Sequence, residues 1–231
     1  MLKSLRHLWL YWTNYLIIRI LVFPVLKQNV TLETFGNAGA SWKVPSSLLT
    51  KNSICYCAGV GEDISFELAL SERIHPQIFL FDPTPRAIRY IQKQNLPKKM
   101  QFFQWGLWST NSRQKFFAPP QASFVSHSIV NLHDTTEYFL AECKSLDWIL
   151  TKLGHTTIDL LKIDIEGAEY EVLKKMLRTR TRPRIIEIEF DQPTPVLKTY
   201  TMIKQLLEAK YTLVDQTNWN FIFIRNTETT I

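Results

Sequence analysis

Cysteine and glycine are scarce in this 231-residue chain, which has three cysteines and seven glycines. Cys55 and Cys57 lie two residues apart in an apolar run, Cys143 stands alone, and no second pair or His cluster accompanies them. That pattern is a poor match to a zinc site and gives no disulfide framework. We therefore expect buried free thiols in a reducing compartment, and a cytoplasmic location.

Internal repeats and low-complexity tracts are absent as well. Hydrophobic residues make up 45% of the chain, which excludes disorder on compositional grounds. The length suits one α/β domain of roughly 200 residues with a short extension. We divide the chain into an N-terminal apolar helix, residues 1–30, and a domain over residues 31–231.

No acidic residue precedes Glu33, and the stretch 5–26 is strongly apolar and aromatic. Its length approaches the roughly 20 residues that span a bilayer. However, Asn14, Arg19 and Pro24 interrupt it, and an Arg near the centre of a membrane span is costly. It lacks a small-residue cleavage site, which argues against a signal peptide.

Two interpretations of this helix stay open. Helical spacing places Lys3, His7 and Asn14 on one face, and it places the larger apolar residues away from that face: Trp9, Trp12, Leu16 and Ile20. Such a helix can lie on a membrane surface. It can equally pack on its own domain or on a second subunit of a homo-oligomer.

The net charge of +6 is partly concentrated in a basic cluster, residues 174–184. No aromatic residue is interleaved there to stack on nucleic-acid bases. We therefore interpret this cluster as a solvated helix end, where cations complement the negative end of the helix dipole, and nucleic acid as a less favoured partner.

From residue 53 onward, short apolar runs alternate with amphipathic stretches, which predicts a parallel sheet flanked by helices. Residues 211–215 and 219–224 are predicted to close the chain as an antiparallel hairpin, and 118–131 to form a long loop. The expected strands are 53–58, 77–82, 100–105, 115–117, 158–164 and 184–190, and the expected helices are 63–72, 85–94, 145–153, 168–178 and 198–209.

The first strand ends in a glycine turn, Gly59-Val-Gly61, before a helix start. Such a turn lets a nucleotide-like ligand approach the backbone and the free N–H groups of the helix. A dinucleotide fingerprint needs a third glycine, but Ile64 stands there. Glu62 and Asp63 would repel a pyrophosphate and would tolerate a positively charged sulfonium, which favours S-adenosylmethionine over NAD.

Asp82 ends the second strand, 21 residues beyond Gly61. A carboxylate at that position can accept the hydroxyl hydrogens of an adenosine ribose. The alternative is a turn or helix-cap residue before Pro83.

Lys162, Asp164 and Glu166 alternate along the expected strand 158–164 and the residues that follow it. Charged residues so close to a core strand are costly unless they pair or serve chemistry. Gly167 then allows a sharp turn into the next helix. A purely structural cluster of ion pairs is the alternative.

Several segments resemble one family. The run DLLKIDIEGAEYEVL resembles the hallmark segment of FkbM-type methyltransferases, and CAGVGEDISFE, FLFDPTP, SHSIV, PRIIEIEFDQ and NWNFIFIR are similar to its other motifs. The resemblance covers roughly residues 50–225. It implies a Rossmann-like seven-stranded methyltransferase sheet with helices on both faces, S-adenosyl-L-methionine as donor, and usually O-methylation. Cys57 and Asp63 depart from the common pattern, which has an acid and a glycine at these positions.

The resemblance also implies roles for individual residues. Gly59, Gly61, Glu62 and Asp63 would line the methionine portion, Asp82 would hold the ribose, and Asp164 would lie near the transferred methyl group. The turn of Trp105, Gly106 and Leu107 would border the adenine. Our candidate general bases are Asp164, Glu166 and His127. Glu189 and Asp191 could complete an acceptor site or bind a divalent ion, although nothing requires a metal.

The expected activity is methylation of a hydroxyl group on a sugar, a glycolipid or a natural product. A nucleic-acid methyltransferase is one alternative, but the Asp-Pro-Pro-aromatic turn typical of adenine N-methylation is replaced here by Asp164-Ile-Glu-Gly. A membrane-associated binding protein with the same fold and no reaction is the other.

Overall fold

The computed structural model describes residues 2–118, 127–131, 134–191 and 194–226, with side chains described from Trp9 onward. Its centre is a seven-stranded sheet in the order β11-β12-β10-β9-β3-β4-β5. All neighbouring strands from β10 to β5 run parallel, and β12 is antiparallel to both β10 and β11. The strands of this sheet are β3 (Ile54–Ala58), β4 (Gln77–Phe81), β5 (Met100–Phe103), β9 (Leu160–Ile163), β10 (Ile185–Glu189), β11 (Tyr211–Thr217) and β12 (Asn220–Arg225).

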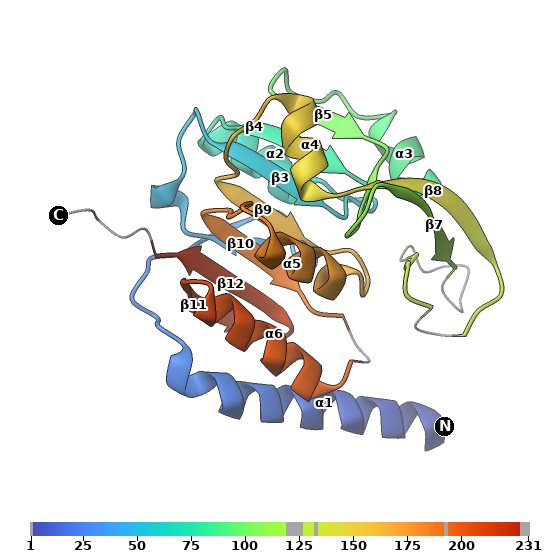
Figure 1. Ribbon diagram of the computed structural model, residues 1–231, viewed down its shortest axis with the longest axis vertical. Helices are drawn as coiled ribbons and strands as arrows, with labels where there is room; N and C mark the ends of the chain where they lie inside the picture. The colour runs from blue at the N-terminus through green and yellow to red at the C-terminus, as the bar shows by residue number, and fades with distance from the viewer. Residues whose placement is uncertain (1, 119–126, 132–133, 192–193, 227–231) are drawn as a thin grey trace.

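Helices cover both faces of this sheet (Figure 1). Successive residues of a strand point to opposite faces of the sheet, so they belong to two separate cores. Tyr56 and Ala58 of β3 belong to the larger core, whereas Cys55 and Cys57 belong to the other. The helices are α1 (Leu2–Val22), α2 (Ser65–Arg73), α3 (Pro85–Ile91), α4 (Leu146–Leu153), α5 (Glu169–Arg178) and α6 (Val196–Glu208), and short 3-10 turns occupy Phe23–Val25 and Ser46–Leu48.

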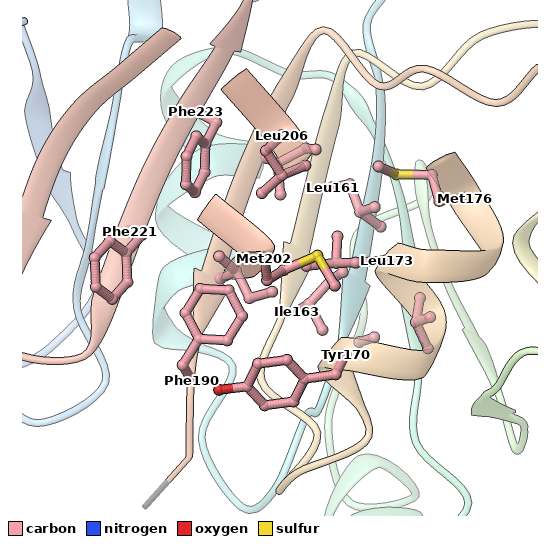
Figure 2. Packing of buried hydrophobic residues seen from close by; sticks show 14 of the residues in the cluster. Leu161, Ile163, Tyr170, Leu173, Met176, Phe190, Met202, Leu206, Phe221 and Phe223 are labelled. Carbon is pink, nitrogen blue, oxygen red and sulfur yellow. The ribbon is translucent and has the colours of Figure 1, made fainter. Parts of the chain in front are cut away.

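The larger core lies between the sheet and helices α5 and α6. Figure 2 shows its apolar side chains meeting: Leu161 and Ile163 come from β9, Tyr170 and Leu173 from α5, and Met202 from α6. The sequence predicts these helices because their apolar residues recur at intervals of three or four positions. Their burial on the sheet is what holds β9 and β10 in place.

The predicted seven-stranded α/β sheet with its C-terminal hairpin is therefore confirmed, with element ends displaced by a few residues. A three-stranded sheet lies beside the main one, formed by β6 (Gly106–Leu107), β7 (Ser112–Phe117) and β8 (Tyr138–Lys144). The sequence predicts only part of it, the strand 115–117 that belongs to β7, and the other two strands were missed. Strand β8 escaped notice because Cys143 is its only buried residue. A short hairpin of β1 (Glu33–Phe35) and β2 (Trp42–Val44) was also missed. Most of the predicted loop, residues 119–126, lies outside the described residues.

Helix α1 packs against α6 and the turn between β11 and β12 (Figure 1). Ile18 and Val22 are buried in the larger core, and the rings of Tyr11 and Tyr15 lie edge-on to Trp219, at 6.2 and 6.4 Å. The interpretation of a helix packed on its own domain is thus correct for this face of α1. Within the described part of the chain, no helix has the length and apolarity needed to cross a membrane.

At the centre of the sheet, the turn after β3 touches the end of β9. Gly59 has φ +87°, and a Cβ atom there would lie 1.7 Å from the carbonyl oxygen of Asp164. The Asp164 amide also donates to the Ala58 carbonyl at 3.0 Å. Only glycine permits this approach, since any side chain would overlap the neighbouring backbone. Gly61 has φ +57° but open space around its Cα.

Two adjacent isoleucines test the docking of α1. Ile18 is fully buried and Ile17 is 43% exposed. We expect Ile18→Ala to lower the free energy of unfolding by about 2–5 kcal/mol, and Ile17→Ala to change it by no more than about 0.5 kcal/mol. Urea unfolding measures both, and equal small losses would mean that α1 is not docked.

The two glycines of the turn form a second matched pair. Gly59→Ala should cost about 3 kcal/mol or more, because strain and overlap with Asp164 add together. Gly61→Ala should cost about 1 kcal/mol, from the left-handed backbone alone. Thermal and urea unfolding compare the two; similar losses would contradict the close approach at Gly59.

Candidate functional site

A cavity of about 270 Å³ opens at the carboxyl ends of the central strands. From β3 the chain order runs outward through β4 and β5, and from β9 it runs the opposite way through β10. Open α/β sheets bind ligands at such a reversal point. Among the predicted site residues, Trp105 and Asp191 do not line the cavity, and the others do: Gly59, Gly61, Glu62, Asp63, Asp82, Gly106, Leu107, His127, Asp164, Glu166 and Glu189.

Asp82 is almost fully buried, and its carboxylate already binds the chain itself. One oxygen accepts the amides of Val60 and Gly61, at 2.9 and 3.0 Å. The other accepts the amide and hydroxyl of Thr84, at 2.8 and 2.6 Å. These four bonds fill the roughly four acceptor positions of a carboxylate. Asp82 therefore holds the glycine turn to the end of β4, and ribose binding stays a prediction.

A buried ion pair lies under the glycine turn. The Lys162 ammonium lies 3.4 Å from a Glu67 carboxylate oxygen and 3.4 Å from the carbonyl oxygen of Gly59. The rings of Trp42 and Phe66 lie within 5.4 and 5.7 Å of the same ammonium. Burial opposes the charge, but the carboxylates of Glu67 and Asp164 outweigh it and raise the pKa of Lys162. Lys162 stays charged and gives the cavity floor one fixed cation.

Three further carboxyl groups, those of Asp164, Glu166 and Glu189, also line the cavity. Burial raises the pKa of Asp164 to about 6; Lys162 opposes this rise, and Glu166 adds to it. Burial and then the charge of Asp164 raise the pKa of Glu189 to about 8. At neutral pH, Asp164 is mostly ionised and Glu189 is mostly protonated.

The turn after Asp164 is fixed by its own hydrogen bonds. Glu169 accepts the amides of Ile165 and Gly167, at 3.2 and 2.9 Å, and the Ser128 hydroxyl donates to the Glu166 carbonyl. Glu166 adopts φ +56°, a conformation that costs energy for a residue with a side chain. Hydrogen bonds to Glu169 and from Ser128 thus hold this acidic turn in place.

Trp105 lies away from the cavity. The Trp105 ring stacks on Phe103 at 4.8 Å and meets Trp148 at 5.2 Å, and Trp105 is absent from the lining residues. Its aromatic neighbours hold the ring against the larger core, and its place beside the adenine stays a prediction. His127 does line the cavity, with its ring 5.2 Å from that of Phe139.

Sequence analysis missed part of the lining. The segment 39–42 between β1 and β2 closes one side, and Phe66, Thr84, Phe116, Ile129 and Asn220 complete the wall. Asn220 lies within the motif NWNFIFIR, but no local sequence pattern was a reason to select this residue.

Among the described residues, no three His, Cys, Asp or Glu side chains are arranged to hold a metal ion. The structure therefore offers no support for the divalent ion considered at Glu189 and Asp191.

Comparison with known proteins places this geometry in a family. The Methyltransferase FkbM domain matches residues 30–213. A search of curated proteins finds no significant match. Among solved structures, an FkbM methyltransferase from Methylobacillus flagellatus KT is 15% identical with a TM-score of 0.52, and the alignment covers 78% of this chain and 46% of that one. This chain therefore spans less than half the length of that structure.

A precorrin-6y C5,15-methyltransferase from Geobacter metallireducens GS-15 is more distant, with 12% identity and a TM-score of 0.43 over 76% of this chain and 81% of that one. The family match covers most of the chain, and it supports S-adenosyl-L-methionine as the methyl donor. It also extends the resemblance noted from residues 50–225 toward the N-terminus. The chain belongs to the FkbM methyltransferase domain family.

Proposed function

We propose that this domain transfers the methyl group of S-adenosylmethionine to a hydroxyl group of a small or carbohydrate-like acceptor. The observation that carries the proposal is the pair of carboxyl groups, Asp164 and Glu189, facing one cavity beside the glycine turn. Their environments push their pKa values apart, to about 6 and about 8. Such a separation is a general sign of distinct acid and base roles.

The residues present fit the donor. Gly61 leaves open space above the turn, and Asp63 and Asp164 supply negative charge for a sulfonium and an ammonium group. The Glu62 carboxylate is paired with the Arg86 guanidinium at 2.6 Å. When bound, S-adenosylmethionine supplies an electrophilic methyl group. The chain's own part is to position the acceptor in line with that group and to exclude water.

Removal of the acceptor proton is assigned to Asp164. An ionised carboxylate can take the hydroxyl proton as the new oxygen–carbon bond forms and the sulfur–carbon bond breaks. Protonated Glu189 can donate a hydrogen bond to a neighbouring acceptor oxygen. Asn220 also lines the cavity, and its amide oxygen is buried without a hydrogen-bond partner among the described atoms. This density of polar groups suits an acceptor with several hydroxyls.

The basic cluster offers little support for a nucleic-acid substrate. The guanidinium of Arg182 donates to the carbonyls of Met176, Leu177 and Thr179 at the end of α5, over 2.6–2.9 Å. Lys174 pairs with Glu171 at 2.7 Å. Arg182 thus caps the end of α5, and the charge of Lys174 is balanced within the helix.

Asp164→Asn should lower the methyl-transfer rate by about 10²–10⁴-fold and lower the affinity for S-adenosylmethionine much less. In the unmodified protein, the rate should rise with pH through about 6, as Asp164 loses its proton. Transfer of labelled methyl groups into cell-extract fractions, followed by mass spectrometry, supplies the rate and the acceptor.

Glu166→Gln is the matched control. The Glu166 charge raises the pKa of Asp164. Removing that charge should therefore shift the rise of the rate with pH to lower pH, while activity is retained. Full activity in Asp164→Asn, or loss of activity only in Glu166→Gln, would remove Asp164 as the base. Absence of S-adenosylmethionine binding by calorimetry would end the proposed function itself.

Asp82→Ala tests whether the Asp82 carboxylate binds the ribose in addition to holding the glycine turn. Loss of the carboxylate leaves the Val60 and Gly61 amides unpaired and should weaken cofactor binding by about 1–3 kcal/mol. Because the turn is also released, the free energy of unfolding should fall as well. Weakened binding with unchanged stability would point to the ribose alone, and unchanged affinity in a folded variant would exclude it.

A further inference from the structure

The outer side of α1 carries a continuous apolar stripe. Five large side chains recur at intervals of three or four residues and face away from the domain: Trp9 (65% exposed), Trp12 (54%), Leu16 (60%), Ile20 (63%) and Phe23 (76%). Single exposed apolar residues are normal on protein surfaces, but a contiguous stripe marks an interaction site. The opposite side of the helix is already buried on the domain through Ile18 and Val22.

We propose that the apolar stripe lies on the surface of an anionic lipid bilayer. Indole rings are favoured at the boundary between headgroups and acyl chains, which suits Trp9 and Trp12. Leu16, Ile20 and Phe23 would enter the acyl region, as in a helix lying parallel to the membrane plane. The inference concerns where the protein binds and does not depend on the methyl-transfer chemistry.

The charges beside the stripe select an anionic surface. Arg19 is exposed at the flank of the stripe, with its guanidinium 5.8 Å from the centre of the Tyr15 ring. Lys27 is exposed just beyond the helix, and the first acidic residue of the chain is Glu33. Arginine and lysine beside an apolar face reach toward lipid headgroups, and each is attracted by anionic lipids.

A second copy of the chain is a weaker occupant. In a two-fold pairing the same patch meets itself, so the two Arg19 side chains would lie across one interface. The sequence of α1 offers no acidic side chain to pair with them. Like charges facing each other oppose association, whereas anionic headgroups neutralise them.

The test is vesicle flotation of the full-length protein. Vesicles of phosphatidylcholine alone are compared with vesicles in which about a third of the lipid is phosphatidylglycerol. The unmodified protein should float with the anionic vesicles, and the bound fraction should fall as salt is raised. The double variant Trp12→Glu/Leu16→Glu should bind about tenfold less or worse. Leu140→Glu, at a 49% exposed residue of β8, is the matched control and should bind normally.

Arg19→Glu gives a second variant that keeps every apolar contact of the stripe. It should reduce binding to anionic vesicles. Cofactor titration and circular dichroism should be unchanged in all variants, which separates failed docking from a failed fold or failed cofactor binding.

The proposal is overturned if the unmodified protein stays with the lipid-free fraction, or if the double variant floats as well as the control. It is also overturned if light scattering shows a dimer that the double variant converts to a monomer without any vesicle binding. The stripe would then be an interface between copies.

Discussion

The contact between Gly59 and the carbonyl of Asp164 is the constraint on which the site depends. It joins the turn after β3 to the turn after β9, at the point where the sheet reverses its chain order. The cavity opens there because helices leave neighbouring strands in opposite directions. A side chain at residue 59 would overlap the backbone of Asp164. With glycine there, the two turns are in direct backbone contact, and no side-chain rotamer can change the distance between them.

Charge burial beneath this contact follows from the sheet register. Cys57, Lys162 and Glu187 lie side by side across β3, β9 and β10. Glu187 is fully buried, its oxygens lack hydrogen-bond partners among the described atoms, and burial raises its pKa well above the ordinary value. Burial thus disfavours its ionised form, although the charge of Lys162 opposes this effect. Lys162 is then balanced by Glu67 from α2, an arrangement in which removal of either partner leaves an uncompensated buried charge.

The sequence predicted the main sheet well because its strands are buried on both faces, so that apolar runs such as residues 78–81 stand out. The glycine turn and the acids after β9 were also placed correctly at one edge. Strand β8 was missed although residues 138–141 are apolar, because only one of its residues, Cys143, is buried, and the run therefore does not mark a core strand. The bonds from the Val60 and Gly61 amides to Asp82, and the place of the segment 39–42 in the cavity lining, were missed for another reason. They depend on contacts between residues distant in sequence, which no local pattern encodes.

Burial of the three cysteines gives the molecule internal chemical reporters. Cys55 and Cys57 lie in β3 of the seven-stranded sheet, and Cys143 lies in β8 of the three-stranded sheet. Burial raises the pKa of all three thiols, that of Cys143 to about 12. Since the thiolate is the reactive form, alkylation requires local opening. The order in which these thiols become modified therefore reveals which of the two sheets separates first.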